Sequence, residues 1–171
     1  MIAEEMEQNV QEIWALFRET DRKFNELREL FTSQWGKLIE ALIAPGALKQ
    51  FQEKGIPVVD TAQRVKTKRN GEAMEIDILA TNTDSVVVLE VKTTLKVGDV
   101  NEFLEERLSR FLEFFPRYRG MKVYGAVAGV NIVEQADRYA YKNGLFVLTL
   151  SGEGTVAILN DEKFIPKDFS Q

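Results

Sequence analysis

Residues 72–92 predict two neighbouring β-strands, and they constrain the fold more than any other part of the chain. A polar turn at 81–84 separates the strands, and the second strand begins with apolar side chains on both faces. Such a strand belongs inside a sheet that is covered on both sides. Glu90 and Lys92 nevertheless continue one of these faces, and Asp77 stands between two isoleucines in the first strand. Carboxylates in such places lose hydration and need a cation or hydrogen bonds. This pair of strands is therefore the first candidate for a functional site.

The residue types that are missing narrow the chemistry of such a site. The 171 residues are 44 % apolar, which is enough for one domain with its own core. The chain contains no Cys and no His. Disulfides, thiolate metal sites, imidazole zinc sites and Ser-His-Asp triads are therefore excluded. The remaining metal ligands are carboxylate oxygens, which select hard cations such as Mg²⁺ or Mn²⁺.

The distribution of charge and hydropathy bears on location and partners. The sequence shows no membrane span and no signal peptide, so we expect a cytoplasmic protein, in keeping with the absence of Cys. The net charge is −5, of which the first 30 residues contribute −4 through eight acidic and four basic side chains. The remaining body is almost neutral, so the overall acidity does not exclude nucleic acid as a partner.

The first 44 residues predict a long helix whose apolar side chains repeat every seven residues. Phenylalanines or aliphatic residues occupy one row, and a second row lies at the matching d positions, although Thr20 and Gln34 interrupt it. The two rows contain Val10, Phe17, Phe24, Phe31 and Leu38, and Met6, Ile13 and Leu27. We interpret residues 1–34 as a coiled-coil arm that makes the protein a homo-oligomer, a dimer or larger, because one apolar stripe needs a partner surface. The alternative is that the helix folds back onto its own domain.

Residues 35–171 predict an α/β domain. Residues 35–44 form a broad apolar helical face with Glu40 at its flank, and Pro45 with Gly46 is expected to end that helix. Strands follow at 57–69, 122–128, 145–150 and 155–159, with helices from Asp99 as N-cap to 115 and at 132–142. The strand–helix–strand order implies parallel pairing after the antiparallel hairpins, and therefore a mixed sheet flanked by helices.

The strand at 57–69 carries a basic strip, which we define as Arg64, Lys66, Lys68 and Arg69. The first three alternate along the strand and are expected to share one face, with Arg69 near the Asn70-Gly71 turn. One interpretation is that the strip binds phosphates of a nucleic acid. The other is that lysines protect an exposed sheet edge from aggregation.

The placement of the acidic residues resembles the PD-(D/E)XK nuclease superfamily. The resemblance rests on Ile76-Asp77, on Glu90-Val91-Lys92 thirteen positions after the aspartate, and on the helical Glu40 upstream. Residues 35–111 are also similar to an uncharacterised, largely cyanobacterial family with an N-terminal coiled coil. The superfamily implies a restriction-endonuclease-like fold over residues 35–150. Ile76 replaces the proline of the motif, and Thr93 and Thr94 stand where many relatives have a glutamine.

The candidate site residues fit metal-dependent hydrolysis of a phosphodiester. Asp77 and Glu90, on adjacent strands, are expected to hold Mg²⁺ or Mn²⁺, with Glu40 as a further ligand. Lys92 lies on the same face as Glu90 and is expected to orient or deprotonate water and to stabilise the charge on phosphorus. We therefore expect a Mg²⁺-dependent nuclease with DNA as the favoured substrate.

Two alternatives remain open from the sequence. In the first, Glu90 and Lys92 form a solvated pair at a strand end while Asp77 caps a turn. In the second, the domain is a catalytically inactive nuclease fold that serves as a coiled-coil-mediated interaction module or as a nucleic-acid-binding protein.

Overall fold

The computed structural model describes residues 1–151 and 153–171, which divide into two compact units, residues 1–37 and 38–171. One helix, α1 (Ile2–Glu53), runs from the first unit into the second. The first unit contains the seven-residue repeat as far as Phe31, and Leu38, its last member, belongs to the second unit. No helix in the described part of the chain is long and apolar enough to cross a membrane.

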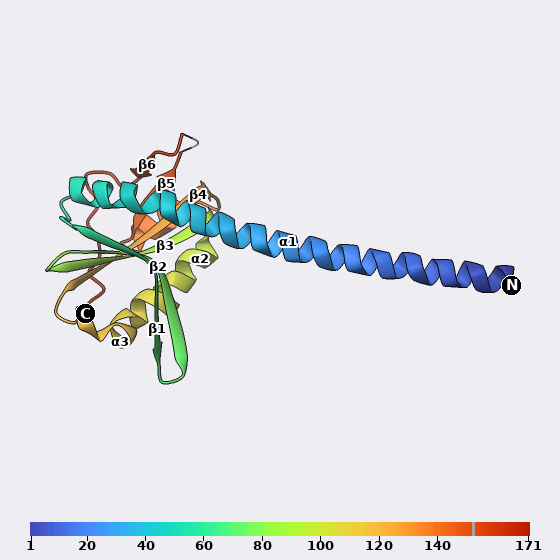
Figure 1. Ribbon diagram of the computed structural model, residues 1–171. Helices are drawn as coiled ribbons and strands as arrows, with labels where there is room; N and C mark the ends of the chain where they lie inside the picture. The colour runs from blue at the N-terminus through green and yellow to red at the C-terminus, as the bar shows by residue number, and fades with distance from the viewer. Residues whose placement is uncertain (152) are drawn as a thin grey trace. The chain divides into compact units, whose positions relative to one another are not determined.

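The second unit is built on a six-stranded mixed sheet (Figure 1). Its order is β1-β2-β3-β4-β5-β6, so that each strand pairs with its neighbours in the sequence. The β1–β2, β2–β3 and β5–β6 pairs are antiparallel, whereas β3–β4 and β4–β5 are parallel. This mixed α/β architecture with a long N-terminal helix confirms the predicted fold class. The strands are β1 (Asp60–Arg69), β2 (Glu72–Thr81), β3 (Ser85–Leu95), β4 (Lys122–Ile132), β5 (Phe146–Leu150) and β6 (Val156–Ile158).

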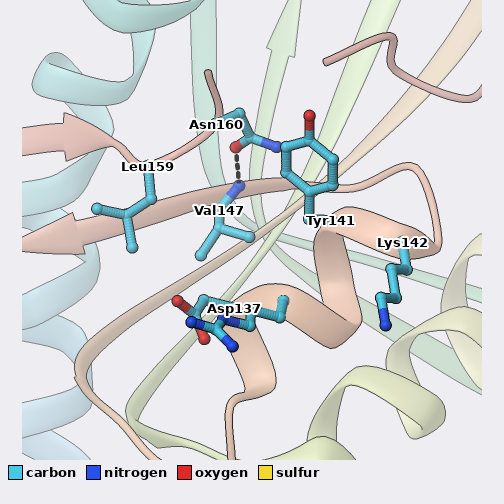
Figure 2. A pocket seen from close by; sticks show the side chains of 7 residues that line it. Asp137, Tyr141, Lys142, Val147, Leu159 and Asn160 are labelled. Carbon is cyan, nitrogen blue, oxygen red and sulfur yellow. Dashed lines mark hydrogen bonds between the residues drawn. The ribbon is translucent and has the colours of Figure 1, made fainter. Parts of the chain in front are cut away.

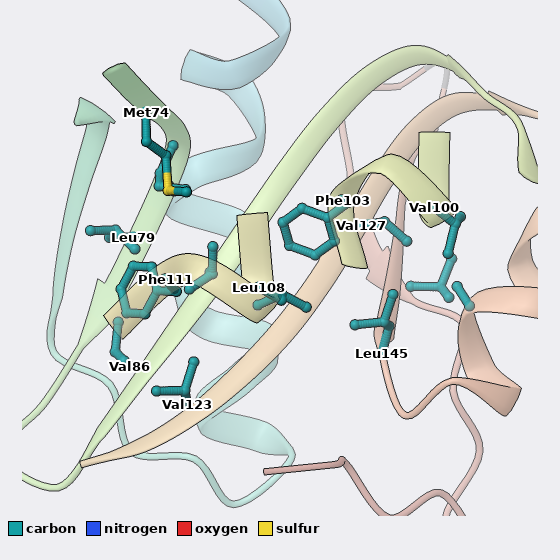
Figure 3. Close-up of a cluster of buried hydrophobic side chains, with 14 of the residues drawn as sticks. Met74, Leu79, Val86, Val100, Phe103, Leu108, Phe111, Val123, Val127 and Leu145 are labelled. Atoms are coloured by element: carbon teal, nitrogen blue, oxygen red, sulfur yellow. The ribbon is translucent and has the colours of Figure 1, made fainter. Parts of the chain in front are cut away.

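Helices cover both faces of this sheet, and each layer has its own apolar core. On one face, the end of α1 packs through residues such as Ile43 and Phe51 against Val87 and Leu89 of β3. On the other face lie the helical segment 97–118 and α4 (Ala136–Lys142). Figure 3 shows this second core, in which Phe103, Leu108 and Phe111 lie against the sheet. Because both faces are covered, Val86, Val87, Val88 and Leu89 of β3 are buried as the sequence predicts, whereas Val91 is partly buried.

The expectation that Pro45 and Gly46 end the first helix is wrong. Helix α1 continues through Pro45 to Glu53. A proline inside a helix costs roughly 3 kcal/mol. The turns after it bury Ala47 and Phe51 completely, and burial of large apolar side chains contributes about 1.5–3 kcal/mol each. Packing against the sheet therefore outweighs the local cost of the proline.

The helical segment that follows β3 is irregular. It comprises α2 (Val97–Glu102), a π-helical turn at Phe103–Arg107, a 3₁₀ turn at Leu108–Arg110, α3 (Phe111–Phe114) and a second 3₁₀ turn at Pro116–Tyr118. The helix begins two residues before the predicted N-cap. Asp99 instead occupies the third helical position, where its side chain accepts a hydrogen bond from the Lys96 backbone N–H at 2.9 Å. The helix predicted at 132–142 starts at Ala136 because β4 extends to Ile132.

Candidate functional site

The candidate site lies where β2 separates from β3. The ladder between these strands runs from Thr81–Val86 to Ile78–Leu89 and ends there. By continuation of that register, the next two residues to face each other are Asp77 and Glu90. At this point the Val91 backbone N–H donates to Asp77 Oδ2 at 2.8 Å. An aspartate side chain thus replaces the next ladder bond, which fixes its carboxylate beside β3.

Burial raises the pKa of the Asp77 and Glu90 carboxyl groups. Desolvation raises the pKa of Asp77, partly opposed by the Val91 N–H and the Lys92 charge. Desolvation and then repulsion from Asp77 raise the pKa of Glu90 to about 7, while the positive charges of Lys92 and Arg107 oppose this. Two carboxylates that lack water and repel each other favour a bound proton or a bound cation.

Lys92 lies next to this pair. Its ammonium Nζ is 3.5 Å from Glu90 Oε1, and the Glu90 side chain is 14 % exposed. The Lys92 side chain is 36 % exposed, so the pair expected in the first alternative is present but its acidic partner is mostly buried. The other part of that alternative, in which Asp77 caps a turn, is wrong. Asp77 instead bonds across to the neighbouring strand.

Glu40 forms an ion pair with Arg64 of β1. The residue is 7 % exposed, and its Oε2 lies 3.4 Å from Arg64 Nη1. Arg64 also lies 3.4 Å from Glu75 through Nη2, and its charge lowers the pKa of Asp77. Glu40 is thus linked to the carboxylate pair through a guanidinium. Its predicted role as a further metal ligand stays a prediction.

The backbone of Arg64 has an unusual conformation. Its φ is +51°, a left-handed conformation that costs free energy for a residue other than glycine or asparagine. The β1–β2 ladder passes from Gln63–Ile78 to Val65–Ile76, with Arg64 opposite Asp77 between these pairs. A strained residue beside the candidate carboxylates is typical of functional sites.

The rest of the basic strip lies along β1, which is an edge strand. Lys66 Nζ is 3.6 Å from Glu75 Oε2, and Arg69 Nε donates to the Phe114 carbonyl at 3.3 Å. Lys68 is exposed. Arg64 and Lys66 therefore neutralise carboxylates of the protein itself, while Lys68 points to solvent on the edge. Phosphate binding by the strip stays a prediction.

Arg107 is the residue that sequence reasoning missed. It ends the π turn, has φ −111° and ψ −66°, and its charge lowers the pKa of Glu90. Its buried Nε has no hydrogen-bond partner among the described residues. An unsatisfied buried donor typically costs about 1–3 kcal/mol, so it calls for an explanation. A signal in the sequence existed, because a lone arginine interrupts the apolar face that runs from Phe103 to Leu108.

The donor set fits a hard cation with few protein ligands. Within residues 1–151 and 153–171, no group of three or more Asp or Glu side chains is placed to hold a metal ion. Asp77 and Glu90 form a set of two. Mg²⁺ commonly retains several waters and binds proteins through one or two carboxylates together with substrate phosphate. Two partly desolvated carboxylates with raised pKa values are therefore a suitable site for Mg²⁺ or Mn²⁺.

A separate pocket lies between α4 and the chain after β6. Figure 2 shows its lining, which includes Tyr141, Val147 and Leu159, and its volume is about 320 Å³. Asn160 closes one side through its hydrogen bond with the Val147 N–H at 2.7 Å. The residues around this pocket are different from those of the carboxylate site.

Comparison with known proteins gives similarities of fold alone. No family profile and no curated protein matches the sequence. Similar solved structures include a protein of unknown function, AF1548 (20 % identity, TM-score 0.42, covering 67 % of this chain and 56 % of that one). Another is a repair endonuclease from Pyrococcus abyssi (22 % identity, TM-score 0.38, covering 61 % of this chain and 45 % of that one). A third is the structure of an EndoMS–dsDNA2 complex (21 % identity, TM-score 0.37, covering 63 % of this chain and 44 % of that one). The chain thus spans 44–56 % of these proteins, and TM-scores below 0.5 assign it no activity.

Proposed function

We propose that this protein is a Mg²⁺- or Mn²⁺-dependent nuclease that hydrolyses phosphodiester bonds, with DNA as the favoured substrate. The observation that carries the proposal is the Asp77–Glu90 pair with Lys92 beside it. Burial raises the pKa of both carboxyl groups, repulsion from Asp77 raises that of Glu90 further, and an ammonium group lies 3.5 Å from Glu90. Carboxylates that hold a cation and a lysine that faces the reacting water are the groups that this reaction needs.

In this proposal, each residue has a distinct role. Asp77 and Glu90 hold the cation, which when bound neutralises charge on the phosphate and makes water more acidic. The Val91 N–H fixes the Asp77 carboxylate. Lys92 orients the attacking water and stabilises the negative charge that develops on the phosphate oxygens. Hydrolysis then adds the elements of water across one P–O bond, which gives a phosphate monoester and a hydroxyl group.

The decisive experiment combines metal binding with cleavage in the wild type and two variants. Asp77→Asn should abolish calorimetric binding of Mn²⁺ and also cleavage, because it removes half of the donor set. Lys92→Ala should retain Mn²⁺ binding but lose about 10²-fold or more in cleavage rate, because its role lies with water and developing charge. Labelled plasmid and oligonucleotides serve as substrates. A wild-type chain that binds no divalent cation at millimolar concentration would contradict the proposal.

A second candidate function is a binding module built on an inactive nuclease fold. The observation that favours it is that Arg64 and Lys66 are engaged by Glu40 and Glu75, so these bases neutralise the protein's own acids. Binding of Mn²⁺ and of nucleic acid without any cleavage would support this module. Cleavage that disappears in Lys92→Ala would reject it.

A further inference from the structure

Arg107 ends the π-helical turn Phe103–Arg107 on the side of the helical segment that faces the sheet. In an ordinary α-helix, four residues rotate by roughly 400°, so Arg107 would lie about 40° from Phe103. Phe103 and Leu108, which flank the turn's end, are buried in the same core at 1 % and 2 % exposure. Arg107 is half-buried beside them.

The surroundings of Arg107 point to the same face of the sheet. Phe103 and Leu108 pack in the core that includes Val86 and Val88 of β3. Glu90 continues that face of β3, and it is close enough to Arg107 for the arginine charge to lower the pKa of its carboxyl. Arg107 can still donate a hydrogen bond, because its buried Nε lacks a partner among the described residues.

We propose that Arg107 binds a non-bridging oxygen of the phosphodiester that occupies the site beside Asp77 and Glu90. The inference rests on the proposed function and adds the residue that recognises the substrate phosphate. A guanidinium presents several donors in a plane and matches the oxygens of a phosphate, and charge-assisted bonds of this kind are strong. A π turn inserted in a helix is frequently found at functional sites. A bound phosphate would supply a partner for the Arg107 guanidinium, whose buried Nε has none among the described residues.

The test measures binding and cleavage in Arg107→Ala and Arg107→Lys. The matched control is Arg119→Ala, which removes the same charge. Arg119 is exposed and precedes β4 at the Ser85–Lys122 pair, the end of β3 remote from Glu90. The probes are fluorescein-labelled 20-nucleotide DNA and RNA, single-stranded and duplex, with Ca²⁺ for binding and Mn²⁺ for cleavage. Thermal unfolding of each variant verifies that it folds.

A phosphate contact gives a specific result. Arg107→Ala should bind about 10-fold or more weakly, and the slope of log K against log salt should fall by about one. Arg107→Lys should keep the slope and recover part of the affinity, and Arg119→Ala should behave like the wild type. A residue that merely balances Glu90 would change stability but leave the slope unaltered, and that outcome overturns the inference.

The outcomes also separate this inference from the proposed nuclease activity. If the wild type binds without cleaving and Arg107→Ala lowers the salt slope, the phosphate contact stands and the nuclease proposal fails. If the wild type cleaves and Arg107→Ala matches it in binding and rate, the nuclease proposal stands and Arg107 has no such role. A wild type that binds none of the four probes overturns the phosphate contact.

Discussion

Glu90 is the first charged residue on the face of β3 that Val86 and Val88 bury. Its pKa in the folded protein is about 7, compared with an ordinary value of 4.5, because burial and Asp77 both oppose ionisation. The folded protein therefore binds more protons than the unfolded chain between these two pH values. Stability is greatest at the acid end of that window and falls as the pH rises through it, which is the sign that linkage requires for a raised carboxyl pKa.

Glu90→Gln should consequently stabilise the protein when no metal is present. At pH 8, we expect the free energy of unfolding to increase by about 1–3 kcal/mol, and the fall in stability between pH 4.5 and 7 to become shallower. Urea unfolding in EDTA across this range measures both effects. Glu102→Gln is the control, since Glu102 is exposed in α2. A variant as stable as the wild type at pH 8, with the same pH profile, would refute the burial argument.

Added Mn²⁺ should reverse the order of stability. A cation that binds the folded state stabilises it by an amount that grows with its concentration. Wild-type protein should gain stability with millimolar Mn²⁺, whereas Glu90→Gln should gain much less because it lacks one of the two carboxylates. Thermal unfolding with and without Mn²⁺ makes the comparison, again with Glu102→Gln as control. Equal gains in wild type and Glu90→Gln would place the cation elsewhere.

The hairpin formed by β1 and β2 illustrates what local sequence predicts well. Asn70 and Gly71 both have positive φ, 51° and 82°, as required at the two central positions of the turn that best joins twisted antiparallel strands. The sequence places Asp77 and Glu90 on neighbouring strands, but it does not give their register. Counting back from the polar turn at 81–84 would set Asp77 opposite Val88, whereas the observed Thr81–Val86 pairing sets it opposite Glu90.

Tertiary packing decided the elements that the sequence did not predict. Pro45 is a helix breaker by its local propensity, and only burial of the following turns against the sheet keeps α1 continuous. The π turn could not be predicted from a period of 3.6, because that period has no place for an extra residue. Arg64 has a left-handed backbone that its residue type disfavours. Arg64 lies opposite Asp77, and the charge of Arg107 at the end of the π turn acts on Glu90.

Different outcomes are expected for two members of the basic strip. Arg64→Ala removes a cation that contacts both Glu40 and Glu75. Since Glu40 is 7 % exposed, we expect a loss of about 1–2 kcal/mol, below the usual cost of breaking a buried pair because the Arg64 side chain is 36 % exposed. Lys68→Ala should change stability by less than about 0.5 kcal/mol. Urea unfolding at pH 7 compares the two. Equal effects would show that the Glu40–Arg64 pair does not contribute to stability.

Nucleic-acid binding separates the two interpretations of the strip. If Lys68 contacts a phosphate, Lys68→Ala should weaken binding irrespective of sequence and lower the salt slope by about one. If it protects the edge strand β1, binding should be unchanged and the variant should aggregate more readily. Binding titrations at several salt concentrations and light scattering of the same samples provide both measurements.

At the scale of the whole molecule, the unit of residues 1–37 carries apolar side chains without an apolar core. Phe17, Phe24 and Phe31 repeat every seven residues and are 59 %, 64 % and 66 % exposed. The stripe widens beyond the two rows of the repeat, because Trp14 and Leu30 are also exposed, at 60 % and 57 %. A membrane surface fits this face poorly, since the first 30 residues carry a net charge of −4. A second copy of the same helix would match the seven-residue spacing.

We therefore predict that the full-length protein is a dimer or a larger homo-oligomer held by residues 1–34. In such an assembly, two or more domains with the Asp77–Glu90 pair would act on one nucleic acid, and its apparent affinity would exceed that of a single domain. Phe17→Gln combined with Phe24→Gln should give monomers at micromolar concentration, because polar groups would replace two core positions of the seam.

The control for this assembly is Arg22→Gln combined with Glu29→Gln. Both residues lie on the side of the helix opposite the two phenylalanines, and the pair of changes leaves the net charge unaltered. Light scattering coupled to size exclusion should give an oligomer for the wild type and the control, and a monomer for the phenylalanine variant. Helicity by circular dichroism should also fall in that variant, because an isolated amphipathic helix loses the packing that stabilises it. A monomeric wild type at micromolar concentration would reject self-association and leave the exposed seam to a different partner.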